Sequence, residues 1–424
     1  MDDPQVLERM RADWNERASE DANYYVAFGA REQNEAEFFA TGDPVMRLLT
    51  AELKRFPGRG AALEIGCGPG RLMRPMSRHF GEIHGVDVSD RMIRLARERL
   101  RDTPNAHPHH GTGSDLSQFA DATFDFVYSY AVFQHIPSRD VVFSYLREAW
   151  RVLKPGGVLR CQLNGLPAHA RQYDTWSGVR IAPDEVREFA RERGFQLLAL
   201  EDIWTQYMWI TCRKRGTDGA AQPGPAAVRN ISNALTGEAA APASGHLAAL
   251  SLWIEHLPGG CGLNDLEVFV EGRPGRLIYI GPPAADHVSQ VNVTLPEGTR
   301  TGLARVDVRW RGDSICPAAW VRILPPGPAI PHIVSVTDGV NLVMNARTIS
   351  GCIKVAMRDV ANAESFRAEL DGREVGDVDS FCTDPAKQTY EFNLILPAEI
   401  GKGAHELRIG LGRRAFAPIA IEVA

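Results

Sequence analysis

Three glycines and one carboxylate stand where they could hold a nucleotide-like ligand. Gly66, Gly68 and Gly70 follow a short apolar run at residues 61–65, which predicts a buried strand that ends in a tight turn. Glycine allows a positive φ and a close approach of the backbone to a ligand. Asp87 follows Gly66 by 21 residues, at the end of a second apolar run. A carboxylate there could accept hydrogen bonds from both hydroxyls of a ribose.

The spacing of the glycines narrows the choice of ligand. A glycine-rich turn alone is shared by sites for NAD, FAD and other nucleotides. Here the pattern is GxGxG, and Arg71 stands where a dinucleotide site usually continues toward a later glycine. That later glycine serves helix packing beside a pyrophosphate, so its absence favours a ligand without one. Asp87 does not discriminate, because NAD sites use the same acid.

These residues need a scaffold, and residues 1–215 alternate strand-like and helix-like segments, which predicts an α/β fold with a mostly parallel sheet. A glycine at 194 is expected to end the last helix. The histidine-rich stretch at 106–110 is expected to be a solvated loop that leads into the third strand. The other strands are expected at residues 61–65, 83–87, 124–129, 158–163, 197–203 and 207–212, and the helices at 4–18, 43–56, 72–79, 91–100, 141–153 and 183–193.

Four segments in this order resemble the motifs of class I S-adenosylmethionine-dependent methyltransferases. Residues 63–71 resemble the first motif, residues 86–92 the second, and residues 124–129 with 133–137 the fourth. Residues 153–157 resemble the turn before the fifth strand. The resemblance implies a Rossmann-like, doubly wound, mostly parallel seven-stranded sheet. It also implies S-adenosylmethionine as cofactor and S-adenosylhomocysteine as product.

The resemblance assigns roles to individual residues. The glycine loop would pack on the methionine and adenosine portions, and Asp87 would hold the ribose. The third motif departs from the family, because Thr112 stands where an acidic residue is frequent, so adenine recognition is expected to fall to Ser114 and Asp115. Independently of the resemblance, the helix with Trp14 and Tyr24 could close over the site, with Arg17 paired to the methionine carboxylate, or could simply dock on the core. The expected cofactor-binding residues are Arg17, Glu64, Gly66, Cys67, Gly68, Gly70, Asp87, Val88, Met92, Ser114, Asp115, Leu116, Ser129 and Tyr130.

Methyl transfer mainly requires alignment and exclusion of water, but a hydroxyl acceptor also needs a base. His135 follows the fourth strand and has a pKa suited to that role, although it could equally be a packing residue. Tyr24 is the second catalytic candidate. Tyr25, Gln162 and Tyr173 are candidates to line the acceptor pocket. The expected acceptor is a small molecule or sugar, methylated at oxygen.

The chain changes character near residue 216. Residues 216–245 are rich in Ala, Gly and Pro and are expected to form a linker, and a second break falls at 324–328. Short alternating strands follow each break and predict β-sandwiches at 220–325 and 329–424, after a first domain at 1–215. Residues 288–296 with Gly302 resemble bacterial immunoglobulin-like repeats. The two sandwiches could be weak internal repeats, and could serve oligomerisation or substrate positioning.

Composition limits the function classes. A formal charge of −6 gives no indication of a nucleic-acid partner, and no apolar run suits a membrane span or signal peptide, so a cytoplasmic protein is expected. Seven cysteines without a CxxC pattern suggest free thiols and no metal site, although Cys261–Cys316 or Cys352–Cys382 could pair. The alternatives are a protein or nucleic-acid methyltransferase and a non-catalytic cofactor-binding scaffold.

Overall fold

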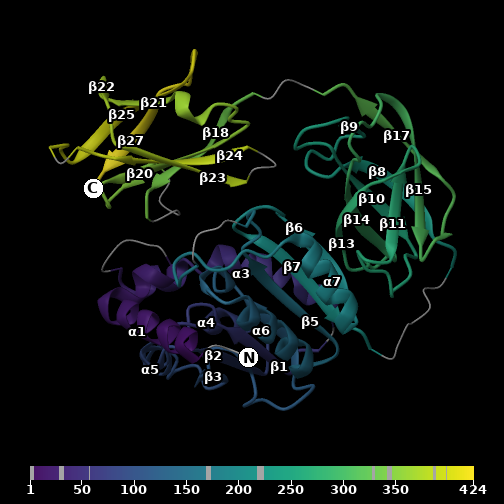
Figure 1. Cartoon of the computed structure of the whole chain (residues 1–424), viewed down its shortest axis with the longest axis horizontal. Coiled ribbons are helices and arrows are strands. Elements are labelled where there is room, and N and C mark those ends of the chain that lie inside the picture. The colour runs from purple at the N-terminus through teal and green to yellow at the C-terminus, as the bar shows by residue number, and fades with distance from the viewer. Residues whose placement is uncertain are drawn as a thin grey trace. The chain divides into compact units, whose positions relative to one another are not determined.

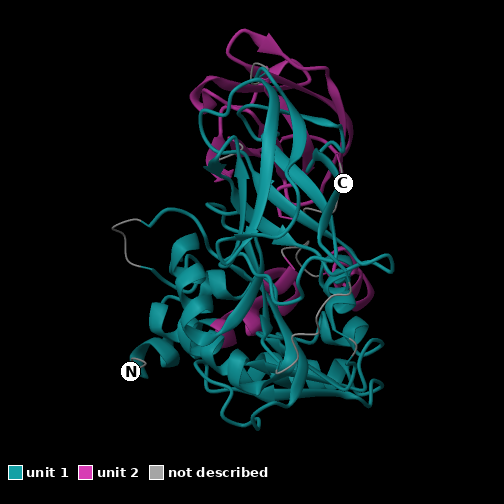
Figure 2. Ribbon diagram, turned by 90° about the vertical axis from the view of Figure 1, so that its right-hand side faces the viewer, with its two compact units in different colours: residues 1–13, 46–327 teal, residues 14–45, 328–424 magenta. Residues whose placement is uncertain are grey.

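The computed structural model forms two compact units (Figure 2). The first comprises residues 1–13 and 46–327, and the second comprises residues 14–45 and 328–424. The described residues are 4–27, 33–56, 58–168, 173–216, 224–326, 330–340, 346–384, 388–397 and 399–424.

The first seven strands form the sheet that the sequence predicts (Figure 1). Their order is β3-β2-β1-β4-β5-β7-β6, and β7 runs antiparallel to both of its neighbours. This is a Rossmann-like arrangement, so the carboxyl ends of the parallel strands meet at one edge. The strands are β1 (Ala61–Ile65), β2 (Glu82–Asp87), β3 (Ala106–His110), β4 (Phe124–Ser129), β5 (Leu153–Leu163), β6 (Phe195–Glu201) and β7 (Met208–Lys214).

The helices follow the predicted periodicity, but α1 (Pro4–Ala27) is longer than the predicted 4–18, α2 (Glu35–Ala40) is not predicted, and two others differ in length. Helix α7 has the predicted bounds, and Gly194 ends it at φ 70° in the left-handed region. Helix α4 covers only four residues, so the predicted helix over 72–79 is too long. The predicted helix over 43–56 becomes α3 followed by a 3₁₀ turn, η1. The helices are α1 (Pro4–Ala27), α2 (Glu35–Ala40), α3 (Asp43–Ala51), η1 (Glu52–Arg55), α4 (Met73–Met76), α5 (Asp90–Arg99), η2 (Phe133–His135), α6 (Arg139–Val152) and α7 (Pro183–Arg193).

The histidine-rich stretch is a strand, so the expectation of a loop at 106–110 is wrong. Strand β3 pairs in parallel with β2, from Ala106 opposite Ile83 to His110 opposite Asp87. It contains Pro108, which is tolerated because β3 is the edge of the sheet. Among the described residues, no group of three or more His, Cys, Asp or Glu could hold a metal ion.

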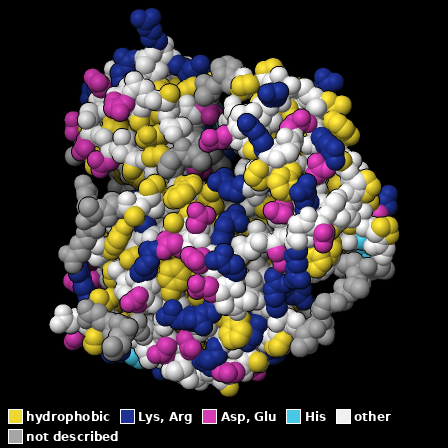
Figure 3. Space-filling view, turned by 45° about the vertical axis from the view of Figure 1, so that its right-hand side comes forward, with side chains coloured by type: hydrophobic (Ala, Val, Ile, Leu, Met, Phe, Trp, Pro, Cys, Tyr) yellow, Lys and Arg dark blue, Asp and Glu magenta, His cyan; other side chains and the backbone are white. Residues whose placement is uncertain are grey.

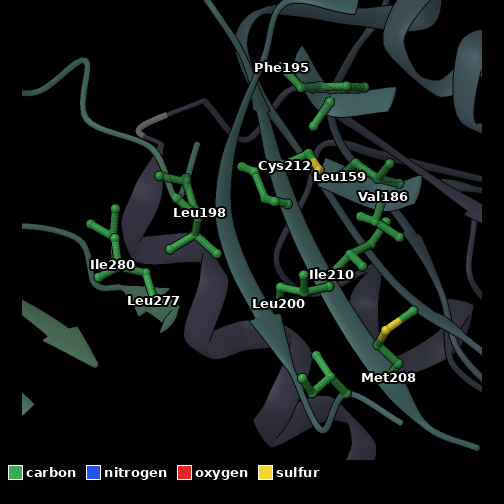
Figure 4. Close-up of a cluster of buried hydrophobic side chains, with 14 of the residues drawn as sticks. Leu159, Val186, Phe195, Leu198, Leu200, Met208, Ile210, Cys212, Leu277 and Ile280 are labelled. Carbon is green, nitrogen blue, oxygen red and sulfur yellow. The ribbon is translucent and has the colours of Figure 1, made fainter. Parts of the chain in front are cut away.

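The sheet does not end at β6. It continues through β13 (Arg276–Ile280), β14 (Val288–Thr294), β10 (Ala249–Glu255) and β8 (Ala227–Asn233) to give eleven strands. Strand β8 and the short β9 (Ala240–Pro242) lie within the predicted linker at 216–245, which is therefore structured over these residues. Figure 4 shows Leu198 of β6 beside Leu277 and Ile280 of β13, within one buried cluster.

A second sheet completes the first unit. Its order is β12-β11-β15-β17-β9, with β16 on β15. Residues from both sheets share one hydrophobic core, for example Leu252 of β10 and Val306 of β15. The strands not yet given are β11 (Leu266–Val270), β12 (Arg273–Pro274), β15 (Gly302–Trp310), β16 (Asp313–Ser314) and β17 (Ala319–Leu324).

The second unit repeats this strand topology. Its sheets are β18-β20-β24-β23 and β19-β27-β25-β21-β22, with β26 on β25, so β18 to β27 pair as β8 to β17 do. The weak internal repeat predicted from sequence is visible in this match, whereas an immunoglobulin-like fold stays a prediction. The strands are β18 (His332–Asp338), β19 (Arg347–Thr348), β20 (Cys352–Arg358), β21 (Phe366–Leu370), β22 (Arg373–Glu374), β23 (Val378–Asp384), β24 (Thr389–Ile395), β25 (Gly403–Leu411), β26 (Arg414–Ala415) and β27 (Ile419–Val423), with a short 3₁₀ turn, η3 (Ala363–Ser365).

Two further expectations concern the chain as a whole. All seven cysteines lie in the described part of the chain, and all are free thiols. No helix in the described ranges combines the length and apolar character that a bilayer crossing needs.

Candidate active site

The glycine loop lies at the carboxyl edge of the sheet, between β1 and α4. Gly66, Gly68 and Gly70 have φ values of 73°, 50° and 87°, as their residue type predicts. The amides of Gly66 and Cys67 both donate to the carbonyl of Val86, at 2.8 and 3.0 Å. A Cβ on Gly66 would lie 2.4 Å from a methyl of Val132. The loop is therefore pinned to β2 and closely covered, and only glycine fits its first position.

Asp87 is the last residue of β2, and its carboxylate accepts a hydrogen bond from the same loop. One carboxylate oxygen accepts from the Gly68 amide at 2.9 Å, and the other accepts from the Ser89 amide at 2.8 Å. Burial raises the pKa of Asp87, although these two hydrogen bonds act in the opposite direction. A carboxylate has about four acceptor positions, so two backbone donors leave room for two hydroxyls. The geometry therefore suits the ribose contact predicted for Asp87.

Glu64 lies inside the sheet, directly before the loop. The Tyr128 hydroxyl donates to it at 2.9 Å from the neighbouring strand β4. Burial raises the pKa of Glu64 to about 8, while Tyr128 and Arg71 lower it and Asp87 raises it further. The guanidinium of Arg71 lies 5.7 Å from the centre of the Tyr130 ring. The Glu64 carboxyl, directly beside the loop, therefore gains or loses its proton near neutral pH.

The predicted adenine-side residues fall into two groups. Val88 packs on Gly113, where an added Cβ would lie 2.9 Å from a Val88 methyl. Asp115 accepts from both the amide and the hydroxyl of Ser117, and Ser114 is buried beside it. The side chains of Met92 and Leu116 are almost wholly buried in the protein core. Val88 and Asp115 are partly exposed, whereas Ser114, Met92 and Leu116 are buried, and the predicted contacts of all five with the cofactor stay predictions.

Two predicted residues lie at the carboxyl end of β4 and differ in their surroundings. Ser129 is fully buried, and its hydroxyl donates to the carbonyl of Ile65 at 2.8 Å, which joins β4 to β1. Tyr130 is partly exposed, and its ring lies 6.0 Å from that of Trp209. The amide of Ala131, at φ 57°, donates to Gln162 at 3.1 Å. Tyr130 is thus partly open to solvent at this edge, and Ser129 fixes β4 to β1.

His135, the candidate base, lies in η2 and is only 5% exposed. Its Nδ1 is 3.2 Å from the carbonyl of Trp176, so this nitrogen carries the proton and donates it. Its Nε2 is then an acceptor, 3.4 Å from the amide nitrogen of Gln134. His135 thus holds the loop that contains Trp176, and its role as a base stays a prediction.

Helix α1 is divided between the two units. Residues 4–13 of α1 lie in the first unit, where Met10 is buried in the core and Asp13 accepts from the Thr175 hydroxyl. Arg17 and Tyr24 lie in the second unit. Arg17 packs on the ring of Trp14, 4.6 Å from its centre, and the Tyr24 amide donates to Asp21. Their roles over the cofactor stay predictions.

An aromatic and charged group at the same edge was not identified from the sequence. Arg160 lies 4.3 Å from the centre of the Trp209 ring and pairs with Glu201 at 2.7 Å. Nearby, in the β6–β7 connection, Trp204 is 37% and Tyr207 is 40% exposed. The sequence signal for this group is that three aromatic residues, Trp204, Tyr207 and Trp209, fall within six positions. Their pairing with Tyr130 depends on long-range strand order, which the sequence does not display.

A model of a methyltransferase domain matches residues 63–161, which contain the glycine loop, Asp87 and the region after β4. The chain is 30% identical over 176 residues to phosphoethanolamine N-methyltransferase 2 of Caenorhabditis elegans, covering 39% of each chain. It is 32% identical over 174 residues to a ubiquinone biosynthesis O-methyltransferase of Cereibacter sphaeroides, covering 36% of this chain and 69% of that one. A demethylmenaquinone methyltransferase of Staphylococcus saprophyticus is 33% identical over 103 residues, which cover 24% of this chain and 42% of that one.

One solved structure is also similar over part of its length. Phosphoethanolamine N-methyltransferase 1 of Haemonchus contortus, in complex with phosphoethanolamine and S-adenosylhomocysteine, matches with a TM-score of 0.40 at 13% identity, over 52% of this chain and 51% of that one. The chain thus spans well under two thirds of several of these relatives, including the first described above.

Proposed function

Because this chain belongs to the S-adenosylmethionine-dependent methyltransferases, with that molecule as cofactor, we propose that it methylates a small-molecule acceptor at oxygen. The observation that carries the proposal is the joint position of the glycine loop, Asp87 and the exposed aromatic residues at one sheet edge. When bound, the cofactor supplies an electrophilic methyl group on a sulfonium. The chain's residues need to bind it, orient the acceptor, exclude water and handle one proton.

The residues at the edge fit the cofactor. The pinned loop allows close backbone approach, and Asp87 keeps acceptor capacity for ribose hydroxyls. Val88, Ser114 and Asp115 are proposed to contact the adenine. Arg17 is proposed to pair with the carboxylate of the methionine portion, as charge-assisted hydrogen bonding would favour.

A small acceptor is supported by two lines of reasoning. The names of the relatives refer to phosphoethanolamine, ubiquinone and demethylmenaquinone, all of which are small molecules. Tyr130, Trp204 and Tyr207, which are at least partly exposed, also offer aromatic faces, on which a planar ring or a sugar can pack. Figure 3 shows acidic, basic and apolar side chains interspersed on one face, and the net charge is −6. Neither feature favours a nucleic-acid substrate.

Methylation at oxygen requires that the acceptor hydroxyl lose its proton. His135 is proposed as the base through Nε2, because Nδ1 donates to Trp176. Tyr24 remains a second candidate. The two-sheet regions after residue 224 are proposed to aid oligomerisation or acceptor positioning.

The proposal is tested by titrating S-adenosylhomocysteine into the full chain by calorimetry. Asp87→Ala is expected to weaken binding about tenfold or more, because it removes a charged acceptor from both the loop and the ligand. Asp90→Ala is the matched control, since Asp90 lies three residues away and pairs with Arg94 on the exposed surface of α5. An acceptor screen with methyl-labelled cofactor then follows. Absence of binding by the unmodified chain would refute the proposal.

A further inference from the structure

A small cavity lies where β6 meets the segments that join it to the two-sheet region. Its volume is about 110 Å³, roughly the space of three or four water molecules. Arg55 of η1, Gln196 of β6 and Arg213 of β7 line it, together with residues from 257–261 and 280–283. Gln196 is the second residue of β6 and pairs with Arg213 near the end of the antiparallel β7, so the cavity stands at the amino edge of the sheet. The glycine loop and Asp87 occupy the opposite edge.

Arg55 is almost completely withdrawn from solvent, with a side chain that is 3% exposed. Its Nε contacts the carboxylate of Glu52, and its Nη1 donates to the carbonyl of Ile280 at 2.7 Å. Its guanidinium lies 5.2 Å from the centre of the Tyr279 ring. Among the described residues, Nη2 has no hydrogen-bond partner. A buried donor in this state is costly, and its persistence suggests that a ligand satisfies it.

Arg213 brings a second positive charge to the same small space. Its Nε donates to the carbonyl of Gly156 at 3.2 Å. Burial lowers the pKa of Arg213, and the charge of Arg55 lowers it further. No acidic residue occurs among the described residues that line the cavity. Glu52 balances only one of the two guanidinium groups, so the cavity holds an excess of positive charge.

We propose that this cavity binds a small oxyanion, the size of inorganic phosphate, between the guanidinium groups of Arg55 and Arg213. Guanidinium groups present paired N–H donors that match the oxygens of such anions. The volume excludes a nucleotide, which needs several hundred Å³. The anion would connect η1 and β7 with the segments around residues 257–261 and 280–283. Its binding would stabilise the folded unit by mass action, whatever the acceptor of the methyl group is.

The test measures the melting temperature of the full chain against increasing phosphate, with chloride replacing phosphate at constant ionic strength. Phosphate is expected to raise the melting temperature, both with and without saturating S-adenosylhomocysteine. Arg213→Gln is expected to weaken the apparent phosphate affinity about tenfold or more. Arg215→Gln is the matched control, because Arg215 also contacts this region, through Gly260 and Asp265, but does not line the cavity. It should keep the phosphate response.

The outcomes distinguish failure of the proposed anion site from failure of the proposed methyltransferase function. A missing phosphate effect, or an undiminished one in Arg213→Gln, overturns the anion site whether or not S-adenosylhomocysteine binds. Loss of S-adenosylhomocysteine binding with an intact phosphate effect overturns only the proposed function. If Arg213→Gln does not fold, crystals of the unmodified chain grown in phosphate decide the matter. Density for an oxyanion between the two guanidinium groups supports the site, and an anion-free cavity overturns it.

Discussion

The buried carboxyl of Glu64 makes the stability of the folded chain depend on pH. Its carboxyl has a pKa of about 8 in the folded chain, against an ordinary value of 4.5. Between these two values the folded protein keeps a proton that the unfolded chain has lost. The free energy of unfolding must therefore fall as the pH rises through this window.

Replacing Glu64 by Gln should remove that dependence. Each pKa unit corresponds to about 1.4 kcal/mol, so the unmodified chain is expected to lose a few kcal/mol relative to Glu64→Gln between pH 5 and pH 8. Urea unfolding of both proteins without cofactor at several pH values measures the difference. Glu98→Gln, an exposed position on α5, is the control and should follow the unmodified chain. Parallel curves for Glu64→Gln and the unmodified chain would contradict the prediction.

His135 allows its two possible roles to be separated by substitution. Asparagine can still donate to the Trp176 carbonyl but cannot take a proton from an acceptor. If His135 is the base, His135→Asn should lower kcat by about 10²–10⁴-fold with little change in melting temperature, and should remove one limb of the pH–rate profile. If His135 only holds the loop, His135→Asn will keep kcat, whereas His135→Ala will lose both kcat and stability.

At the residue scale, the sequence predicts the features that depend on residues close together in the chain. The positive φ of the three loop glycines follows from their residue type and position, and the structure has it. The Tyr128–Glu64 hydrogen bond and the Arg160–Trp209 contact join strands far apart in the chain. Such contacts depend on strand order and register, and no local pattern encodes them.

At the element scale, α1 connects to the loop that holds His135. Asp13 accepts from Thr175, whose neighbour Trp176 receives the hydrogen bond of His135. Gly178 in turn donates to the carbonyl of Gln134 at 2.7 Å. Residues 4–13 and the loop at 174–178 therefore form one layer on this edge of the sheet.

Thr175→Val tests this layer with little change in shape. Loss of the hydroxyl removes one hydrogen bond to a carboxylate, worth about 1–3 kcal/mol. Amide exchange in residues 4–13 is expected to become at least several-fold faster, while β4 stays protected. Thr123→Val is the control, because its hydroxyl bonds only within its own turn, to Ala120. Equal exchange rates in the two variants would contradict the connection.

The elements themselves were predicted unevenly, for physical reasons. Strand β4 and helix α7 have the predicted bounds because apolar runs and end signals agree there. Strand β3 was predicted as a loop because its polar residues and Pro108 resemble one. Pairing with β2 and the stacking of His84 on His109, with ring centres 5.2 Å apart, make it an edge strand. Strand β8 was missed because only long-range pairing with β10 defines it.

At the scale of the whole molecule, the eleven-stranded sheet joins two regions that the sequence separates. Strand β13 pairs with β6 at Tyr279 and Ala199, and the amide of Leu263 donates to the carbonyl of Leu197 at 2.8 Å. Arg187 of α7 adds hydrogen bonds to the carbonyls of Leu263 and Leu277. The division at about residue 215 stays a prediction, but the backbone hydrogen bonding crosses it.

Arg187→Ala should weaken both sides of this junction together. Two hydrogen bonds from a charged donor are lost, and an effect of about 2–4 kcal/mol is expected. Hydrogen exchange should then rise in both β7 and β14, which flank the junction. Arg191→Ala, one turn along the same helix and paired with exposed Glu188, should change stability by about 0.5 kcal/mol or less. Faster exchange confined to one side would show that the two regions unfold independently.

The ribosome synthesises the strands of the shared sheet in chain order, so β6 is complete before its partner β13 exists. Strand β6 ends at Glu201, and β13 ends at Ile280, roughly 80 residues later. At about 5–20 residues per second, the outer edge of β6 waits about 4–16 s for its partner. During that interval the nascent chain presents an open strand, the kind of edge that recruits other chains. Slower translation or crowded polysomes should therefore increase aggregation of this protein before its synthesis is complete.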